Sequence, residues 1–446
     1  MTDVALAPRD RGDDPGTGAT SLGTRAGTVD VAVVGLGYVG LPTVLALHAA
    51  GRTVVGIDVS PERLEAIRRV DCDLIEEDRQ RLAVAVADTE RFHVTADPAR
   101  LGEAAAVVIA VPTPIDAHAV PDLRALRAAC DTVVRHARVD QTILLTSTTY
   151  VGSTEELLAE PLRRRGLFVG TDVHVAFSPE RIDPGNTVNT QDVTPRVVGG
   201  VTPACTARAA RVLGHVAPEV VAVSSAEAAE MTKLLENTFR AVNIAFANEI
   251  ADVCGHHGID VTEVIGAAAT KPYGFMPFMP GPGVGGHCIP CDPHYLLWGL
   301  RPQRHRAPVT EQAMATLEAR PLRVVERARA VLGQRGMALA GARVLVAGVA
   351  YKPDVADVRE SPAAVVLDGL LDAGARTSYV DPLVERLDLP SGRHLRSLPS
   401  VDAEPVDLVV VHTLHAALPA YELLTHAPLV LDCTYRLPVG DHVFRP

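Results

Sequence analysis

The chain has no excess of positive charge. It holds 42 Lys and Arg against 54 Asp and Glu, for a formal net charge of −12. Binding to nucleic acid or to an anionic membrane surface depends on clustered basic residues that face phosphate. The composition therefore argues against both kinds of partner, and an anionic ligand would need local basic groups.

An uninterrupted membrane-spanning run is also missing. The most hydrophobic stretch, residues 31–50, is long enough to span a bilayer, but it contains three glycines and a proline and leads into another strand pattern. It is typical of a soluble strand and helix. Residues 1–28 lack the apolar core of a signal peptide, and we predict a disordered N-terminal extension there.

The seven cysteines are odd in number and scattered through 446 residues, which is not the pattern of a disulfide framework. A reducing cytoplasm is therefore the expected location. With 47% hydrophobic and 22% charged residues, the chain has the composition of a soluble globular protein with about two to three domains.

Short β-branched runs alternate with helical segments from residue 29 to about 200, as in DVAVVG, TVVGIDV, AAVVIAV and QTILLTS. This rhythm predicts a mostly parallel sheet. The strand signal then fades, and AEAAEMTKLLENTFRAVNIAFANEIADVCGHHG predicts a long helix that ends at glycine. A second alternation begins at ARVLVAGVAYK. We therefore predict an α/β protein with two Rossmann-like, doubly wound parallel-sheet domains, 29–202 and 321–446, joined by a central helical domain, 203–320.

The first strand leads into a dinucleotide fingerprint. Gly35, Gly37 and Gly40 form G-x-G-x-x-G between a strand and a helix, where glycines allow a tight turn and close approach to a pyrophosphate. The second strand ends in Asp58, whose carboxylate can bind the ribose hydroxyls of NAD and would repel the extra phosphate of NADP. NAD is the predicted cofactor. The second α/β domain offers only Gly348, so it should hold any ligand differently.

The segment GPGVGGHCIPCDPHY, 281–295, allows three interpretations. His287, Cys288, Cys291 and His294 could bind zinc, but four ligands within eight residues rarely surround one ion. Cys288 and Cys291 could form a redox pair, although such a pair normally opens a helix after a strand. Cys288 could instead be a nucleophile in a glycine-lined loop, and we favour this over a metal site or a plain buried cysteine.

These features together resemble the UDP-glucose/GDP-mannose dehydrogenase family over nearly the whole chain after residue 28. The landmarks, in order, are GLGYVG, VPTP, TSTTYVGST, FSPERIDPGN, EMTKLLENTFRAVNIAFANE, PGPGVGGHCIPCDPHYL and GVAYKPDVADVRESPA. The resemblance implies an NAD-binding domain, a central domain with the cysteine loop and a C-terminal domain that binds the UDP of a nucleotide sugar. No metal is implied.

The resemblance also implies a four-electron oxidation of the sugar C6 alcohol to a carboxylate, with two NAD⁺ used in succession. Cys288 would carry a thiohemiacetal and then a thioester. Glu180 would activate the hydrolytic water, and Lys233 and Asn237, four apart on the predicted helix, would stabilise the oxyanion. Asp292 and Thr148 would position water or the reacting hydroxyl. The ordinary alternatives are a solvated helix face for Lys233 and Asn237, and a helix cap for Asp292.

Further contacts follow from the same matches. The implied cofactor contacts are Gly35, Gly37, Tyr38, Val39, Gly40, Asp58, Arg63, Thr113, Thr148 and Arg359. The implied substrate contacts are Glu180, Arg181, Lys233, Asn237, Gly285 and Lys352.

Departures from the family pattern indicate a branch. TKPYGFMPF lacks the arginine usual in UDP-glucose dehydrogenases, and with HCIP it resembles enzymes of UDP-N-acetylhexosamines such as UDP-N-acetylglucosamine or UDP-N-acetylmannosamine. Cys291, His294 and LEARP (317–321) also depart from the expected residues. The alternatives are UDP-glucose or GDP-mannose as substrate, or a catalytically silent nucleotide-sugar binder, which should lack Cys288, Glu180 or Lys233. Members of this family make sugar acids for glycans, and they commonly dimerise through the central domain, which implies a homodimer or higher homo-oligomer.

Overall fold

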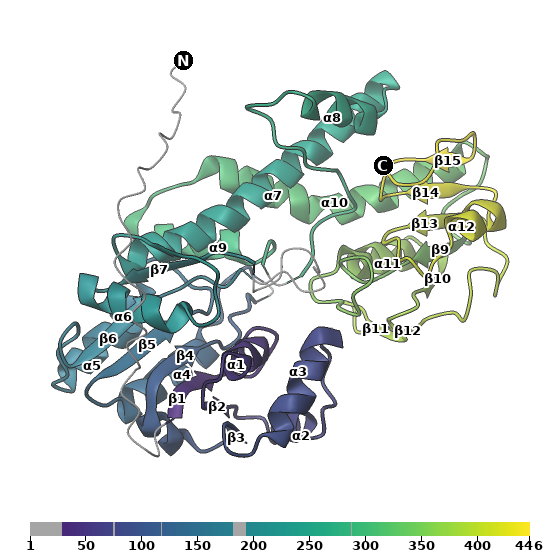
Figure 1. The fold of residues 1–446 in the computed structure, drawn as a ribbon. Coiled ribbons are helices and arrows are strands. Elements are labelled where there is room, and N and C mark those ends of the chain that lie inside the picture. The colour runs from purple at the N-terminus through teal and green to yellow at the C-terminus, as the bar shows by residue number, and fades with distance from the viewer. Residues whose placement is uncertain (1–28, 75, 117, 182–192, 287) are drawn as a thin grey trace.

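The computed structural model describes residues 29–74, 76–116, 118–181, 193–286 and 288–446. The predicted disordered extension, 1–28, lies outside the described residues. In Figure 1 a purple-to-blue sheet domain and a green-to-yellow sheet domain lie at opposite ends, and two long helices, α7 and α10, run between them. The predicted fold class, two Rossmann-like sheets joined by helices, is confirmed.

The first sheet has eight strands in the order β3-β2-β1-β4-β5-β6-β7-β8. Neighbours pair in parallel except for β6 and β7, which are antiparallel. The strands are β1 (Val29–Val34), β2 (Val54–Ile57), β3 (Phe92–Thr95), β4 (Ala104–Ile109), β5 (Gln141–Leu145), β6 (Val173–Phe177), β7 (Arg196–Gly200) and β8 (Val220–Ala222). The order of the first six strands is that of a dinucleotide-binding fold, whose ligands bind where the strand order reverses, here between β1 and β4.

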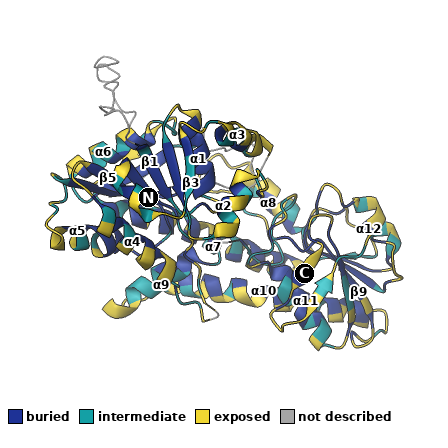
Figure 2. Ribbon diagram, turned by 90° about the horizontal axis from the view of Figure 1, so that it is seen from below, coloured by how far each residue is buried: buried dark blue, intermediate teal, exposed yellow. Residues whose placement is uncertain are grey.

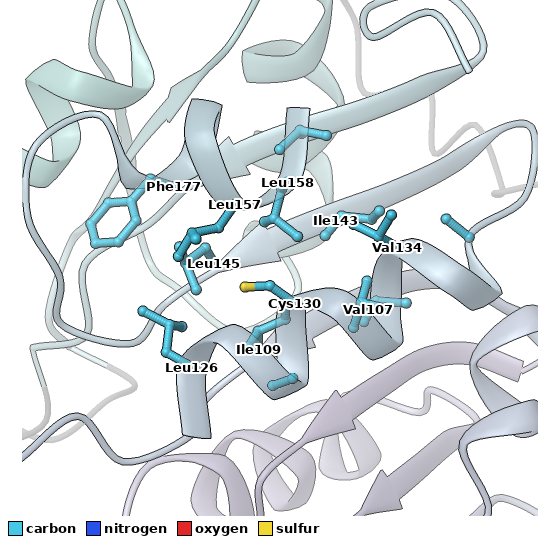
Figure 3. Close-up of a cluster of buried hydrophobic side chains, with 14 of the residues drawn as sticks. Val107, Ile109, Leu126, Cys130, Val134, Ile143, Leu145, Leu157, Leu158 and Phe177 are labelled. Atoms are coloured by element: carbon cyan, nitrogen blue, oxygen red, sulfur yellow. The ribbon is translucent and has the colours of Figure 1, made fainter. Parts of the chain in front are cut away.

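Helices cover both faces of this sheet. They are α1 (Gly40–Ala49), α2 (Pro61–Arg68), α3 (Glu76–Ala87), the 3₁₀ helix η1 (Pro98–Glu103), α4 (Arg124–His136), the π-helix η2 (Glu155–Ala159), α5 (Glu160–Arg164) and α6 (Pro203–Leu213). Ser60 and Thr202 cap α2 and α6 with their hydroxyls, each followed by proline at the first helical position. Figure 3 shows Cys130 of α4 among the buried side chains of β4, β5 and η2.

The first sheet extends beyond residue 202, where we placed the end of this domain. Helix α6 packs against β6 and β7, and β8 pairs with β7. Strand β8 has only three residues, and none of them is buried. Its strand pattern is therefore too short and too weak to be recognised from the sequence.

The central part is helical, as predicted. It comprises α7 (Ala226–His257), α8 (Val261–Ala269), α9 (Asp292–Leu300), the 3₁₀ turn η3 (Arg301–Gln303) and α10 (Pro308–Gly333). Helix α7 has 32 residues, begins at a hydroxyl cap from Ser225 and ends before Gly258, whose φ is +68°. Helix α10 continues through Pro321, so the predicted boundary at 320 falls inside a helix that also packs on α11 of the second sheet domain.

The second sheet is parallel, with the order β10-β9-β13-β14-β15. The domain built on this sheet comprises β9 (Arg343–Ala347), α11 (Pro362–Asp372), β10 (Arg376–Val380), β13 (Leu408–Val411), α12 (Ala420–His426), β14 (Val430–Asp432) and β15 (Val443–Phe444). A separate small hairpin is formed by β11 (Arg386–Asp388) and β12 (His394–Arg396). Figure 2 shows buried strands in both sheets and helices exposed on their outer faces.

Candidate active site

The glycine fingerprint forms a tight loop between β1 and α1. Gly35 has a φ of +87°, and a Cβ atom there would lie 2.6 Å from the carbonyl oxygen of Ala110, the residue after the neighbouring strand β4. A Cβ at Gly40 would lie 1.8 Å from the Gly35 oxygen. Nothing lies within 4 Å of the Cβ position at Gly37, so the backbone there is open. The loop therefore fits the close approach of a dinucleotide pyrophosphate at the start of α1.

Asp58 follows β2 and lies against this loop. Its Oδ2 accepts a hydrogen bond from the Leu36 N–H at 2.7 Å, and its Oδ1 accepts one from the Ser60 N–H at 2.9 Å. Arg63, on α2, donates from Nε to the Leu36 oxygen at 2.8 Å. The structure thus brings both predicted residues to the glycine loop, where the half-buried Asp58 carboxylate fits the ribose diol of NAD.

The C-terminal domain reaches the same loop through Arg359. Its guanidinium lies over the ring of Tyr38, 4.3 Å from the ring centroid. It also makes a forked pair with Asp357, at 3.0 Å from Nε and 2.6 Å from Nη2. Val39, next in the loop, is the N-cap residue of α1. The two α/β domains therefore meet at the predicted cofactor site.

Thr113 and Thr148 lie in the loops that follow β4 and β5. Thr113 is buried, and its carbonyl oxygen accepts a hydrogen bond from the Tyr295 hydroxyl of α9 at 3.2 Å. Thr148 is half-buried. Both loops are at the carboxyl edge of the sheet, where a parallel sheet binds its ligands.

Cys288 and Cys291 have different surroundings. Cys288 is half-buried, and its carbonyl oxygen accepts the Asp292 N–H at 2.9 Å in the turn that leads into α9. Burial raises the pKa of the Cys288 thiol, and the nearby Lys233 ammonium is the strongest influence that lowers it. Cys291 is buried, and burial raises the pKa of its thiol to about 12. Of the two, Cys288 is the thiol that a substrate can reach.

Lys233 and Asn237 lie on the buried face of α7, so the alternative of a solvated helix face is wrong. Lys233 donates from Nζ to the carbonyl oxygen of Glu180 at 2.7 Å. Asn237 donates from Nδ2 to Oδ2 of Asp292. Asp292 is the first residue of α9, its side chain contacts Asn237, and the cap position falls on Cys291, so the cap alternative is wrong as well.

Asp292 is fully buried, and burial raises the pKa of its carboxyl group to about 6, against the opposing effect of Lys233. Its Oδ1 atom is buried without a hydrogen-bond partner among the described residues. An unpartnered buried oxygen is unfavourable unless a ligand or water completes it. The Lys233 ammonium, the Asn237 amide and the Asp292 carboxyl therefore form one polar group beside Cys288.

Glu180 lies beyond the end of β6 and is buried. Its Oε1 accepts a hydrogen bond from the Arg181 N–H at 2.7 Å, and its Oε2 accepts one from Nη1 of Arg196 at 2.6 Å. The Arg181 guanidinium pairs with Glu236 on α7. Sequence reasoning missed Arg196, although a charged residue at the start of the hydrophobic strand RVVGG is a signal that could have pointed to it.

A second missed residue, Glu230, is on α7 three residues before Lys233. Its buried carboxylate accepts four hydrogen bonds from residues 152–154, namely Gly152 N, Ser153 Oγ, Thr154 N and Thr154 Oγ1, at 2.5 to 2.9 Å. Burial raises the pKa of Glu230. This carboxylate ties the loop that carries Thr148 to the helix that carries Lys233. The spacing of Glu230 and Lys233 on one helix face was the available signal.

The glycines before Cys288 pack against the C-terminal domain. A Cβ at Gly285 would lie 2.6 Å from Cβ of Tyr351, and the Gly286 N–H donates to the Arg359 oxygen at 2.9 Å. Lys352, half-buried, follows Tyr351. The structure gives a reason for the glycines of this loop, because any side chain at Gly285 would force this domain contact apart.

The second sheet domain repeats the glycine turn but closes it. Gly348 has a φ of +74°, and the Val349 N–H donates to Oδ2 of Asp381 at 2.6 Å, as Leu36 does to Asp58. Nε2 of His415 lies 3.1 Å from the same Asp381 oxygen, and both side chains are fully buried. The carboxylate that corresponds to Asp58 is thus enclosed by protein, so a second dinucleotide cannot bind this domain in the same way.

All seven cysteines lie in the described part of the chain, and none is in a disulfide. Within the described residues, no three His, Cys, Asp or Glu side chains come together as metal ligands. His287, one member of the zinc hypothesis, lies outside the described residues. None of the described helices is both long enough and apolar enough to cross a membrane.

Comparisons with known proteins agree with this architecture. Residues 29–217, 227–318 and 345–437 match, in turn, the NAD binding domain, the central domain and the UDP binding domain of the UDP-glucose/GDP-mannose dehydrogenase family. Three relatives illustrate the similarity.

The UDP-N-acetyl-D-mannosamine dehydrogenase of Yersinia pestis is 34% identical over 371 residues, which cover 80% of this chain and 86% of the relative. The NDP-N-acetyl-D-galactosaminuronic acid dehydrogenase of Ralstonia solanacearum is 32% identical over 397 residues, which cover 86% and 90%. The solved structure of a UDP-D-ManNAc dehydrogenase from Pyrococcus horikoshii has a TM-score of 0.84 at 30% identity, covering 93% of this chain and 98% of the other.

Proposed function

Because the chain belongs to the UDP-glucose/GDP-mannose dehydrogenase family and is an NAD-dependent nucleotide-sugar dehydrogenase, we propose that it oxidises the C6 alcohol of a UDP-N-acetylhexosamine to the carboxylate. The observation that carries the proposal is the group formed by Lys233, Asn237 and Asp292 next to the half-buried Cys288 thiol. An alcohol dehydrogenase that stops at the aldehyde needs no nucleophile at this position.

When bound, NAD⁺ accepts one hydride from C6 in each of two oxidations, so that two NADH form for each sugar. The Asp292 carboxylate, beside the Lys233 ammonium, accepts the proton that leaves the C6 hydroxyl. The Cys288 thiolate then adds to the aldehyde carbon, and the Lys233 ammonium and Asn237 amide stabilise the alkoxide of the thiohemiacetal. Loss of the second hydride leaves a thioester.

Hydrolysis of the thioester completes the reaction. A water oxygen adds to the carbonyl carbon while its proton passes to Glu180, and the carbon–sulfur bond then breaks to release the sugar acid and the Cys288 thiolate. The main-chain carbonyl oxygen of Glu180 accepts a hydrogen bond from the Lys233 ammonium at 2.7 Å. The general base and the oxyanion-stabilising group are thus joined.

The branch assignment is supported by two observations. The relative at 34% identity is a UDP-N-acetyl-D-mannosamine dehydrogenase, and the relative at 32% identity is an NDP-N-acetyl-D-galactosaminuronic acid dehydrogenase. The segment TKPYGFMPF also lacks an arginine. We infer a UDP-N-acetylhexosamine as substrate and UDP-N-acetylmannosamine as the first sugar to test. A silent binder is disfavoured, because the chain keeps Glu180, Lys233 and Cys288.

The direct test measures NADH release with limiting UDP-N-acetylmannosamine, UDP-N-acetylglucosamine, UDP-glucose and GDP-mannose in parallel, with NADH counted per sugar consumed. Two NADH per UDP-N-acetylhexosamine are expected. A ratio of one would mean that the reaction stops at the aldehyde. Equal or better turnover of UDP-glucose would overturn the branch assignment, and no NADH with any sugar would favour a binding protein.

We also propose that the enzyme is a homodimer through α7. An apolar stripe is exposed along this helix, at Met231, Leu235, Phe239, Phe246 and Val253. A second copy would cover it, since exposed apolar stripes of this length mark interfaces. Sedimentation should show a dimer for the wild type and a monomer for the double variant Leu235→Glu/Phe246→Glu. A monomeric wild type would disprove this.

The sugar acid would serve glycan assembly in the cytoplasm.

A further inference from the structure

The segments that flank residues 182–192 are held side by side at the end of β6 and the start of β7. These strands are antiparallel, with Phe177 opposite Gly199. Beyond the paired residues, the Ser178 hydroxyl donates to the Val197 oxygen at 2.8 Å, and Nη1 of Arg181 donates to the Pro195 oxygen at 3.0 Å. Glu180 and Arg196 face each other between these two contacts.

The pair formed by Glu180 and Arg196 is almost fully buried. Nη1 of Arg196 lies 2.6 Å from Oε2 of Glu180, and the side chains of Arg196 and Glu180 are 4% and 9% exposed. Transfer of two charges out of water costs more than their attraction returns in many proteins, so a buried ion pair is weak evidence for a role in stability. An ion pair on the candidate general base has a more direct explanation in the chemistry.

We propose that Arg196 is a positioning residue for the hydrolytic half of the reaction, which fixes the orientation of the Glu180 carboxylate. The proposal rests on the role of Glu180 in the proposed function. Arg196 contacts no reacting atom. It acts through Glu180, whose other oxygen accepts the Arg181 N–H and whose carbonyl oxygen accepts the Lys233 ammonium.

The ion pair decides the expected behaviour. A guanidinium held 2.6 Å from one carboxylate oxygen fixes the direction of that carboxylate, and without it the carboxylate can rotate. The other charged groups facing this residue are Arg181, itself paired with Glu236, and Lys233 on α7. They remain in an Arg196 variant. Only the Arg196 guanidinium is removed, so the defect should be confined to hydrolysis.

The two oxidations do not use the Glu180 carboxylate, so they should proceed without Arg196. Attack of water on the thioester does use it. Loss of Arg196 should therefore separate the two halves of the reaction. NADH would form in a fast phase, and the acyl group would stay on Cys288.

The experiment compares wild type, Arg196→Met, Arg196→Lys and Glu180→Gln in single turnovers from pH 6 to pH 9, with NADH formation followed by absorbance and the acyl enzyme by intact-protein mass spectrometry. Arg343→Met is the matched control, because its pair with Asp407 is half-exposed at the start of β9. We expect Arg196→Met to slow hydrolysis at pH 7 by about 10- to 100-fold, with NADH formation at the wild-type rate. Arg196→Lys should stay within a few fold of wild type.

A purely structural role for Arg196 would give a different result. Both phases would then slow together, and Arg343→Met would remain normal. If Arg196→Met does not fold, Arg196→Lys still decides, because a loss of NADH formation equal to the loss of hydrolysis would contradict the proposal. An acyl enzyme absent from Glu180→Gln would instead show that the proposed hydrolytic mechanism is wrong, whatever Arg196 does.

Discussion

The amide nitrogen of Asn237, on α7, donates a hydrogen bond to Oδ2 of Asp292, the first residue of α9. Both side chains are buried, and the second oxygen of Asp292 has no hydrogen-bond partner among the described residues. This bond joins the long central helix to the helix that follows Cys288. It also places a carboxyl group with a raised pKa where the substrate hydroxyl is expected.

The Asp292 carboxyl should make folding less favourable at neutral pH. Its pKa is raised by burial to about 6 from 3.8, so its favourable contribution is complete below pH 3.8 and is lost as the pH rises through about 6. Asp292→Asn should therefore be more stable than wild type at pH 8, by up to about 3 kcal/mol, with little difference near pH 4. Its activity should fall by at least about 100-fold.

Denaturant unfolding of both proteins from pH 4 to pH 8 measures this difference. Asp88 is an opposite-sign control, since its hydrogen bond with His48 lowers its pKa to about 2. Its stabilising effect is present above pH 3.8 and is lost as the pH falls toward 2, so Asp88→Asn should lose stability at pH 7. An Asp292→Asn protein that is less stable than wild type at every pH would contradict the prediction.

The two cysteines of the active-site loop should differ in function. Cys288→Ser should abolish the second NADH, because a serine hydroxyl forms no thioester, whereas Cys291→Ser should retain turnover within a few fold. Alkylation by iodoacetamide should label Cys288 and accelerate as the pH rises to 9, because burial raises the pKa of its thiol.

Peptide mapping after alkylation identifies the labelled thiol. Cys130→Ser is a suitable control, since Cys130 is buried among the side chains of Figure 3 and its thiol has a pKa of about 12. A dead Cys291→Ser together with an active Cys288→Ser would reverse the assignment of the nucleophile.

Arg359 should matter for the cofactor more than for the sugar. Its guanidinium lies over Tyr38 in the glycine loop, at 4.3 Å, although it belongs to the C-terminal domain. Arg359→Met should raise the KM for NAD⁺ by about tenfold and change the KM for the nucleotide sugar by less than about threefold, as expected when a single charged contact is lost. Steady-state kinetics with each substrate varied in turn measure both constants.

Tyr38→Phe is the matched control, because the ring under the guanidinium remains and only the hydroxyl is removed. It should behave as wild type. An equal rise in both KM values for Arg359→Met would show that the residue holds the two domains together without a preference for the cofactor.

Asp58 should set the choice between NAD⁺ and NADP⁺. Asp58→Asn keeps an oxygen that can accept the Leu36 N–H, a bond of 2.7 Å in the wild type, but it removes the negative charge. The preference for NAD⁺ over NADP⁺ in kcat/KM should fall by about tenfold or more, since repulsion of the extra phosphate is lost.

The comparison needs both cofactors at saturating sugar. Asp30→Asn serves as a control, because Asp30 accepts a hydrogen bond from the Thr53 N–H at 2.8 Å, near the opposite end of the strands. An unchanged cofactor preference in Asp58→Asn would place the discrimination elsewhere in the loop.

Local patterns in the sequence were sufficient for much of this protein. Gly35, Gly37 and Gly40 with Asp58 predicted the dinucleotide loop, and the run that begins after Ser225 and ends at Gly258 predicted α7. Lys233 and Asn237 were placed on one helix face by their spacing alone. These features depend on neighbours within a few residues, on backbone conformation and on helical period, and each is therefore readable without the fold.

Contacts between distant segments were decided only by the tertiary structure. The weak strand β8 joins the first sheet because β7 offers it a hydrogen-bonding edge. Helix α10 continues through Pro321, where α7 of the central part and α11 of the second sheet domain both pack against it. Arg196 and Glu180 are 16 residues apart, Glu230 is 76 residues from Thr154, and Gly285 meets Tyr351 of another domain. No periodic pattern encodes such pairs, because burial and complementary charge select them only after the chain has folded.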